Sequence, residues 1–259
     1  MTATDQDSGQ ESRGVNNSVV VLFKGGRRPS WYYLSSRQQQ DYSQQHVNLM
    51  LAVCQKYHLK HLEGFHLLNP QLHWQRFWII EFPSLEGAEA WIKSEMAPPY
   101  GNYGDYEYHL SRRTCQDKFA DWMTRPAPVL SIASWADPHC IPRLQVDRSS
   151  VVVLKFHYWL PSLEQVSRKE DSDEKKNQLL QSVAREHGLM RLEVFQLINP
   201  QRDWHQAWLI EFPTFEGAEA WIQAEVSSSH RTSSLHKMYL ARPWAPAYFS
   251  LWVPPHFTS

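Results

Sequence analysis

The sequence has few cysteines and no familiar catalytic motif. Its three cysteines, Cys54, Cys115 and Cys140, are widely spaced and form no CxxC pair. This spacing argues against a disulfide framework and a structural zinc site, so we expect no bound metal and a reducing setting. No GxGxxG, Walker loop, HExxH or GxSxG is present, which leaves the common nucleotide-binding, zinc-protease and hydrolase templates without support.

The chain also lacks an excess of either charge and any long apolar run. Lys and Arg (26) nearly balance Asp and Glu (27), so no positive field favours nucleic acid or an anionic membrane as partner. No apolar stretch approaches the roughly 20 residues that cross a bilayer. Residues 1–17 are polar, have no secretory layout and predict a disordered lead-in. We therefore expect a cytoplasmic protein.

What the sequence does have is aromatic residues and an internal repeat. It contains 12 Trp, 11 Tyr and 11 Phe, a density that indicates bulky cores or an aromatic-lined cavity. Residues 59–95 match residues 189–225 without a gap at about 22 of 37 positions, which is an internal duplication. The longest shared stretch is WIIEFPSLEGAEAWIKSE at 78–95 and WLIEFPTFEGAEAWIQAE at 208–225.

Hydrophobic periodicity predicts the same elements in both copies. In the first copy we expect strands at 19–24, 62–68, 74–82 and 106–112, with helices at 38–57 and from residue 84. In the second copy the first strand is expected at 151–156, a helix at 178–187 and the last strand at 238–242. Ser84 and Thr214 are the predicted N-caps of the second helix of each copy. The order is the split βαβ unit of ferredoxin-like domains.

We therefore predict an α+β fold in which two tandem ferredoxin-like repeats pack sheet to sheet as a pseudo-two-fold barrel. The expected boundaries are 18–125 for repeat 1, 126–149 for a linker, and 150–259 for repeat 2 with its C-terminal tail. The barrel forms within one chain, so we expect a monomer that contains an intramolecular pseudo-dimer.

Strand alternation separates the two faces of each sheet. A turn at NPQLH would place Gly64 opposite Trp78 and His66 opposite Arg76. We expect the uniformly apolar face to meet the helices, with Phe65, Leu67, Phe77, Ile79, Phe195, Leu197, Ala207 and Leu209. We expect the mixed face to line the barrel, with His66, Trp74, Arg76, Trp78, Ile80, Phe82, Gln196, Trp204, Gln206, Trp208, Ile210 and Phe212.

His66 and Arg76 are the candidate catalytic residues. The histidine would act as a general base and the arginine would hold a carboxylate or enolate. The alternative is a hydrogen-bonded couple at the barrel rim. Repeat 2 has Gln196 and Gln206 at these positions, so a catalytic pair would be asymmetric.

The ligand-binding candidates are the mixed-face tryptophans and glutamines: Trp74, Trp78, Gln196, Trp204, Gln206 and Trp208. The tryptophans would form a wall for a planar ligand, or, alternatively, a solid core. The segments after the two last strands resemble each other and would add an edge strand or clamp the neighbouring half. They contain His139 and His256, which are secondary candidates for the barrel mouth or simply exposed tail residues.

These features resemble the dimeric α+β barrel superfamily, and most closely its small YciI-like and DUF1330-like families. The signature WIIEFPSLEGAEAWI after an aromatic strand, and a last strand containing Arg, carry the resemblance over roughly 19–112 and 151–242. Members usually pair two chains, so this chain is similar to a fused pair. The superfamily includes cofactor-free monooxygenases, cyclases, isomerases, dehydratases and haem enzymes, and fold alone does not select among them.

The predicted function is binding of a small hydrophobic or aromatic metabolite in the barrel between the sheets, without a cofactor. Cofactor-independent monooxygenase, cyclase or isomerase activity is compatible with such a site. One alternative is a non-catalytic structural or protein-interaction barrel. A second is a haem-binding barrel that uses His66 or a tail histidine.

Overall fold

The structure is a computed structural model. It describes residues 18–71, 73–114, 117–123, 150–159, 169–201, 204–227 and 234–244. The predicted lead-in at 1–17, the linker at 126–149, and both His139 and His256 lie outside the described residues.

Both halves of the chain follow the predicted order of elements. Repeat 1 consists of β1 (Val19–Arg27), α1 (Ser36–Tyr57), β2 (His61–Gln71), β3 (Trp74–Phe82), α2 (Leu85–Glu95) and β4 (Gly104–Arg113). Repeat 2 consists of β5 (Val151–Trp159), α3 (Lys169–Glu186), β6 (Arg191–Gln201), β7 (Trp204–Phe212), α4 (Phe215–Ser227) and β8 (Ser234–Pro243). The short 3₁₀ helices are η1 (Pro29–Tyr33), η2 (Tyr100–Tyr103) and η3 (Asp117–Trp122).

Local signals in the sequence set the helix starts. Ser84 and Thr214 accept hydrogen bonds from the backbone N–H groups of Gly87 and Gly217, both at 3.4 Å, as predicted for N-caps. Helix α1 begins at Ser36, two residues earlier than expected, because Ser35 and Gln38 form a capping box.

The eight strands close into one barrel in the order β1-β3-β2-β8-β5-β7-β6-β4. Each repeat supplies four consecutive strands, and the pairs β2–β8 and β4–β6 join the repeats at both edges. Closure leaves neither sheet with an unpaired edge. An α+β fold with a closed barrel is thus confirmed.

The predicted register holds over most of the first hairpin. Gly64 pairs with Trp78 and His66 pairs with Arg76, and Gln196 pairs with Gln206 in repeat 2. The predicted turn is wrong in length, because β2 continues to Gln71 after a register shift. The Asn-Pro-Gln segment therefore belongs to the strand rather than to the turn.

The predicted assignment of sheet faces is inverted. The apolar face fills the barrel, where Val20, Leu22, Phe65, Leu67, Phe77, Ile79, Val152, Leu154, Phe195, Leu197 and Leu209 form one buried cluster. The face with Trp78, Ile80 and Phe82 packs instead against the helices, and so does the equivalent face of repeat 2. Both faces of each sheet are buried, so alternation separates them but does not say which one meets the helices.

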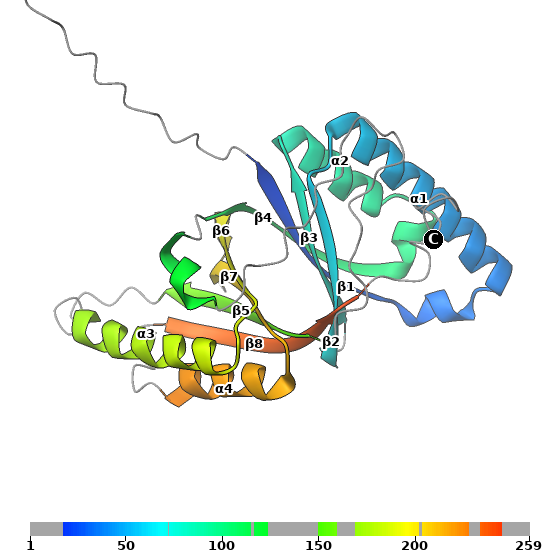
Figure 1. The fold of residues 1–259 in the computed structure, drawn as a ribbon. Coiled ribbons are helices and arrows are strands. Elements are labelled where there is room, and N and C mark those ends of the chain that lie inside the picture. Colours follow the sequence, from blue (N-terminus) through cyan, green and yellow to red (C-terminus); the bar gives the residue numbers. More distant parts are fainter. Residues whose placement is uncertain are drawn as a thin grey trace, which may run out of the picture.

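The helices form two outer layers (Figure 1). Helices α1 and α2 cover the outside of the repeat-1 sheet, and α3 and α4 cover the outside of the repeat-2 sheet. Trp91 and Trp221 are buried in these layers, as predicted for the helical stripe. No described helix is long and apolar enough to span a membrane.

Each repeat sends the residues after its last strand across to the other repeat. The Thr114 N–H donates to the Val194 carbonyl in repeat 2, and the Trp244 N–H donates to the Gly64 carbonyl in repeat 1, both at 2.9 Å. Helix η3 packs on the helices of repeat 2. The residues directly after β4 and β8 therefore contact the neighbouring half, whereas the tail segments predicted to add an edge strand or clamp, 125–139 and 242–256, lie outside the described residues from 125 to 139 and from 245 on.

Gly64 allows a close approach at one of these crossings. A Cβ atom there would lie 2.6 Å from a ring carbon of Trp78 and 2.8 Å from the carbonyl oxygen of Trp244. We expect Gly64→Val, the residue found at the equivalent position 194, to lower the free energy of unfolding by about 1–3 kcal/mol through overpacking. Urea unfolding followed by tryptophan fluorescence measures this. Wild-type stability in this variant would contradict the packing of Trp244 against Gly64.

Candidate functional site

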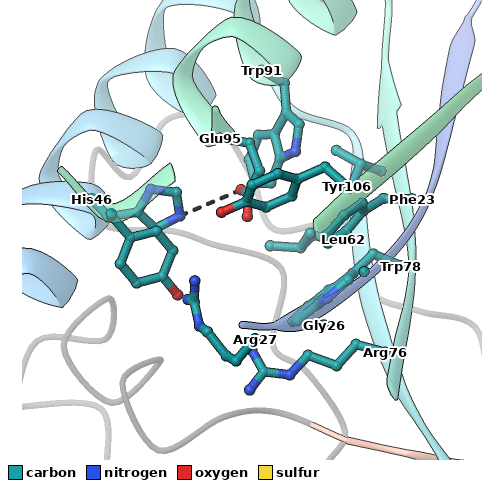
Figure 2. A pocket seen from close by; sticks show the side chains of 13 residues that line it. Phe23, Gly26, Arg27, His46, Leu62, Arg76, Trp78, Trp91, Glu95 and Tyr106 are labelled. Atoms are coloured by element: carbon teal, nitrogen blue, oxygen red, sulfur yellow. Dashed lines mark ion pairs between the residues drawn. The ribbon is translucent and has the colours of Figure 1, made fainter. Parts of the chain in front are cut away.

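A cavity lies between the repeat-1 sheet and its helices, on the outside of the barrel (Figure 2). It holds about 480 Å³ of space, its open mouth included. Its walls are largely aromatic and aliphatic, with Phe23, Leu62, Trp78, Ile80, Trp91 and Tyr106. Strand β1 supplies Gly25 and Gly26 at the mouth. An aromatic lining with a few polar groups is typical of small-molecule sites.

The polar residues of the cavity come from four elements. Arg27 ends β1, His46 lies on α1, Arg76 lies on β3 and Glu95 ends α2. Figure 2 shows the two guanidinium groups on one side of the cavity and Glu95 with Trp91 on the other. A few convergent polar groups in an aromatic cavity are typical of a binding site.

His46 and Glu95 form a buried pair. The Nε2 atom of His46 lies 3.3 Å from Oε2 of Glu95, and the imidazole stacks on the Tyr100 ring at a centroid distance of 4.0 Å. Burial alone would raise the pKa of Glu95, but the charges of His46, Arg27 and Arg76 outweigh it and lower that pKa. Glu95 is therefore ionised at neutral pH.

The two arginines are placed by aromatic side chains. The Arg27 guanidinium carbon lies 3.7 Å from the centroid of the Tyr100 ring and 4.7 Å from that of Trp31. The Arg76 guanidinium carbon lies 4.8 Å from the centroid of Trp244, a residue of repeat 2. Stacking of this kind orients a guanidinium through its flat face.

The equivalent position in repeat 2 is filled by salt bridges. Glu225, the counterpart of Glu95, lies 2.5 Å from the Nζ atom of Lys155 and 2.6 Å from that of Lys176. Lys176 is the counterpart of His46, and Lys155 that of Phe23. The Lys155 side chain is buried, as is Phe23 at the equivalent position of repeat 1.

A two-residue inversion accounts for this difference. The first strand reads VVVLFK in repeat 1 and VVVLKF in repeat 2. Successive residues of a strand point to opposite faces, so Phe23 and Lys155 face the helices while Lys24 and Phe156 face the barrel. The buried salt bridge of Lys155 therefore stands where repeat 1 has the Phe23 ring of the cavity wall.

Two of the residues predicted from the sequence line the cavity, namely Arg76 and Trp78. They lie outside the barrel rather than inside it, as the inverted faces require. His66 shares the face of Arg76 but lies against Trp244, with ring centroids 5.6 Å apart, and is not part of the cavity wall.

Trp74 and Trp204 do face the barrel interior, where they surround a lysine. The Nζ atom of Lys24 lies 3.3 Å from the centroid of Trp204 and 4.9 Å from that of Trp74. It also pairs with Glu107 at 2.9 Å. These rings pack around a charged side chain of the protein itself, in a barrel whose middle is filled by apolar residues.

Gln196, Gln206 and Trp208 form a hydrogen-bonded group on the outer face of repeat 2. Gln206 donates to Gln196 at 2.9 Å, and the Trp208 indole donates to Gln206 at 3.2 Å. The Trp208 ring also meets Phe119 of η3. The structure thus places these three predicted ligand-binding residues away from the cavity of repeat 1.

Sequence reasoning missed Arg27, His46 and Glu95. A signal for Glu95 was present: it follows Trp91 by four residues on the buried stripe of its helix, and the duplication repeats it as Glu225. A carboxylate repeated on an apolar stripe indicates a buried partner. Among the described residues, no group of three or more histidine, cysteine, aspartate or glutamate side chains is placed to hold a metal ion.

Comparison with known proteins supports the fold. No protein-family profile and no curated protein match this chain. Among solved structures, the chain is similar to chlorite dismutase from Candidatus Nitrospira defluvii in complex with imidazole, with a TM-score of 0.62 and 9% identity over 92% of this chain and 94% of that one. The chain is also similar to a mutant of that enzyme in complex with cyanide, with a TM-score of 0.61 and 9% identity over 92% of this chain and 94% of that one. At this identity the likeness shows the fold: an α+β barrel like that of chlorite dismutases.

Proposed function

We propose that this protein binds a small, flat aromatic or hydrophobic molecule in the repeat-1 cavity, between β1, β3 and the helices α1 and α2. The observation that carries the proposal is the contrast between the repeats. In repeat 1, Phe23, Trp78 and Trp91 line a cavity, whereas at the equivalent position of repeat 2 a buried lysine, Lys155, pairs with Glu225. The proposed site lies outside the barrel and not between the sheets. Membership of the YciI-like or DUF1330-like families remains part of the proposal.

The polar groups of the cavity give the site its chemistry. The His46–Glu95 pair can accept or donate a proton, and Arg76 can hold a carboxylate or enolate. These are the groups that cofactor-independent oxygenase, cyclase or isomerase chemistry would use. His66, the other predicted catalytic residue, is positioned for packing on Trp244.

A matched pair of variants tests the proposal. We expect 2-naphthamide, a neutral flat probe, to bind the wild-type protein and quench its tryptophan fluorescence. Trp78→Phe should weaken this binding about threefold to tenfold, because it reduces an aromatic wall. Trp208→Phe, the same change at the equivalent position of repeat 2, should leave it unchanged. Equal effects of the two changes, or a loss of binding only in Trp204→Phe, would contradict the site.

Haem is the second candidate ligand, and the similarity to chlorite dismutases favours it over a ligand in the barrel interior. The cavity offers a buried histidine that a carboxylate orients, as is usual for metal-ligating histidines. With Nε2 of His46 on Glu95 and Tyr100 over one face of the imidazole, Nδ1 is the nitrogen that would hold an iron. We derive no step through haem.

Titration with haemin separates the two candidates. A visible absorption band that forms on binding and is lost in His46→Ala would establish haem ligation by His46. A band that persists in His46→Ala, or no band at all, would exclude it at this cavity.

A further inference from the structure

We infer that the ligand of the repeat-1 cavity carries an anionic group, such as a carboxylate, which Arg27 and Arg76 bind at the cavity mouth. This inference rests on the proposed function and names the chemical class of the ligand. An aromatic acid fits both the walls and the mouth.

The charges of the cavity lining point to an anion. Arg27 and Arg76 bring two guanidinium groups, whereas Glu95 is the only carboxylate of the lining and already contacts His46. Among the residues that the structure describes, none forms an ion pair with Arg27. The cavity is therefore electropositive, and a second negative charge would be stabilised in it.

Both cations are specific to the repeat that has the cavity. The positions equivalent to Arg27 and Arg76 in repeat 2 carry Trp159 and Gln206, which are uncharged. Repeat 2 instead has two lysines, Lys155 and Lys176, and both contact Glu225 directly. A merely structural role for the arginines in the barrel would not predict this coincidence, because the strands and their pairing are alike in both repeats.

The strand pairing brings the two arginines close together. Gly25 pairs with Arg76 in the ladder and lies two residues before Arg27 on the same strand. Guanidinium groups bind carboxylates through parallel N–H donors, which gives charge and geometry together.

Two probes of the same shape test the inference. We expect 2-naphthoic acid to bind the wild-type protein about tenfold more tightly than 2-naphthamide at pH 7, because only the acid makes charge-assisted hydrogen bonds. Arg27→Gln and Arg76→Gln should each weaken binding of the acid about tenfold and weaken binding of the amide much less. Retained binding of the amide also shows that the variants are folded. Isothermal titration calorimetry measures all affinities.

Arg28→Gln is the matched control. Arg28 is the exposed neighbour of Arg27, pairs with Asp105 at 2.8 Å and does not line the cavity. Loss of acid binding in Arg28→Gln equal to that in Arg27→Gln would overturn the assignment. Equal affinity of the wild-type protein for acid and amide would overturn the inference while the proposed function stands. If neither probe binds, the proposed function fails and the inference falls with it.

Discussion

Replacing Arg191 by Met is expected to lower the free energy of unfolding by about 3–5 kcal/mol, the usual cost of leaving buried charges uncompensated. Arg191 begins β6 of repeat 2 and is 3% exposed. Its Nη1 and Nη2 atoms lie 2.8 and 2.7 Å from the carboxylate of Glu63 in repeat 1, and its Nε lies 2.6 Å from Glu193. The variant would leave both carboxylates buried with less positive charge around them.

Urea denaturation at pH 7 measures this loss. Arg191→Lys is the control that keeps the charge but cannot form the bidentate contact, so we expect it to fall between the wild-type protein and Arg191→Met. A change of less than about 1 kcal/mol in Arg191→Met, the size of effect found for exposed ion pairs, would show that the network does not hold the two repeats together.

The same buried charges, Arg191, Glu63 and Glu193, determine how the stability of the protein changes in acid. Burial would raise the pKa of Glu193, but the charges of Arg191 and Arg113 outweigh it and lower that pKa from 4.5 to about 2. A lowered folded-state pKa gives stability that is complete above about pH 4.5 and is lost as the pH falls towards 2. In Arg191→Met, protonation of the buried carboxylates removes the uncompensated negative charge and so costs less stability than in the wild-type protein. The difference in free energy of unfolding between the wild-type protein and Arg191→Met should therefore become smaller as the pH falls from 4.5 towards 2.

The second large effect is expected at the glutamate that ends the duplicated stretch. Glu225→Gln should lower the free energy of unfolding by about 3–5 kcal/mol, because the buried ammonium of Lys155 loses its counter-charge and Lys176 loses a partner. Glu95→Gln, the same change in repeat 1, should cost less, since Glu95 pairs with one imidazole rather than with two ammonium groups.

This pair of variants compares the repeats directly. The denaturant midpoints of Glu225→Gln and Glu95→Gln, measured in the same buffer, give the two losses of stability. An equal dependence of the free energy of unfolding on denaturant concentration shows that the two unfolded states are alike. Equal losses in the two variants would mean that the two glutamates have equivalent surroundings. The cavity of repeat 1 would then lose its main structural argument.

The fold could be predicted because two independent signals agree. The duplication between 59–95 and 189–225 fixes two equal halves, and periodicity of 2 and 3.6 fixes the order of elements inside each half. The register of the first hairpin followed from the positions of its turn residues, except where β2 continues to Gln71.

The site could be predicted only in part, because it depends on which face of the sheet meets the helices. Alternation groups Arg76 with Trp78 correctly, and both line the cavity. It does not tell the barrel face from the helix face when both are buried, so His66 and Arg76 were placed on the wrong side of the sheet. His46 and Arg27 enter the site through tertiary packing of α1 and the end of β1, which no local pattern encodes.

Differences between the copies carry more information about function than their shared motif. The shared stretch supplies Trp91 and Trp221 to the cores and Ser84 and Thr214 to the helix caps. The proposed function rests on positions at which the copies differ, such as Phe23 against Lys155. The structure places Phe23 in the wall of a cavity and Lys155 in a buried salt bridge.

A crystal structure of the protein with bound 2-naphthoic acid tests the central claim most directly. The account predicts ligand density under α1 and α2, with the ring system against Trp78 and Trp91 and the carboxylate at Arg27 and Arg76. Density inside the barrel, against Trp204 and Lys24, would contradict it.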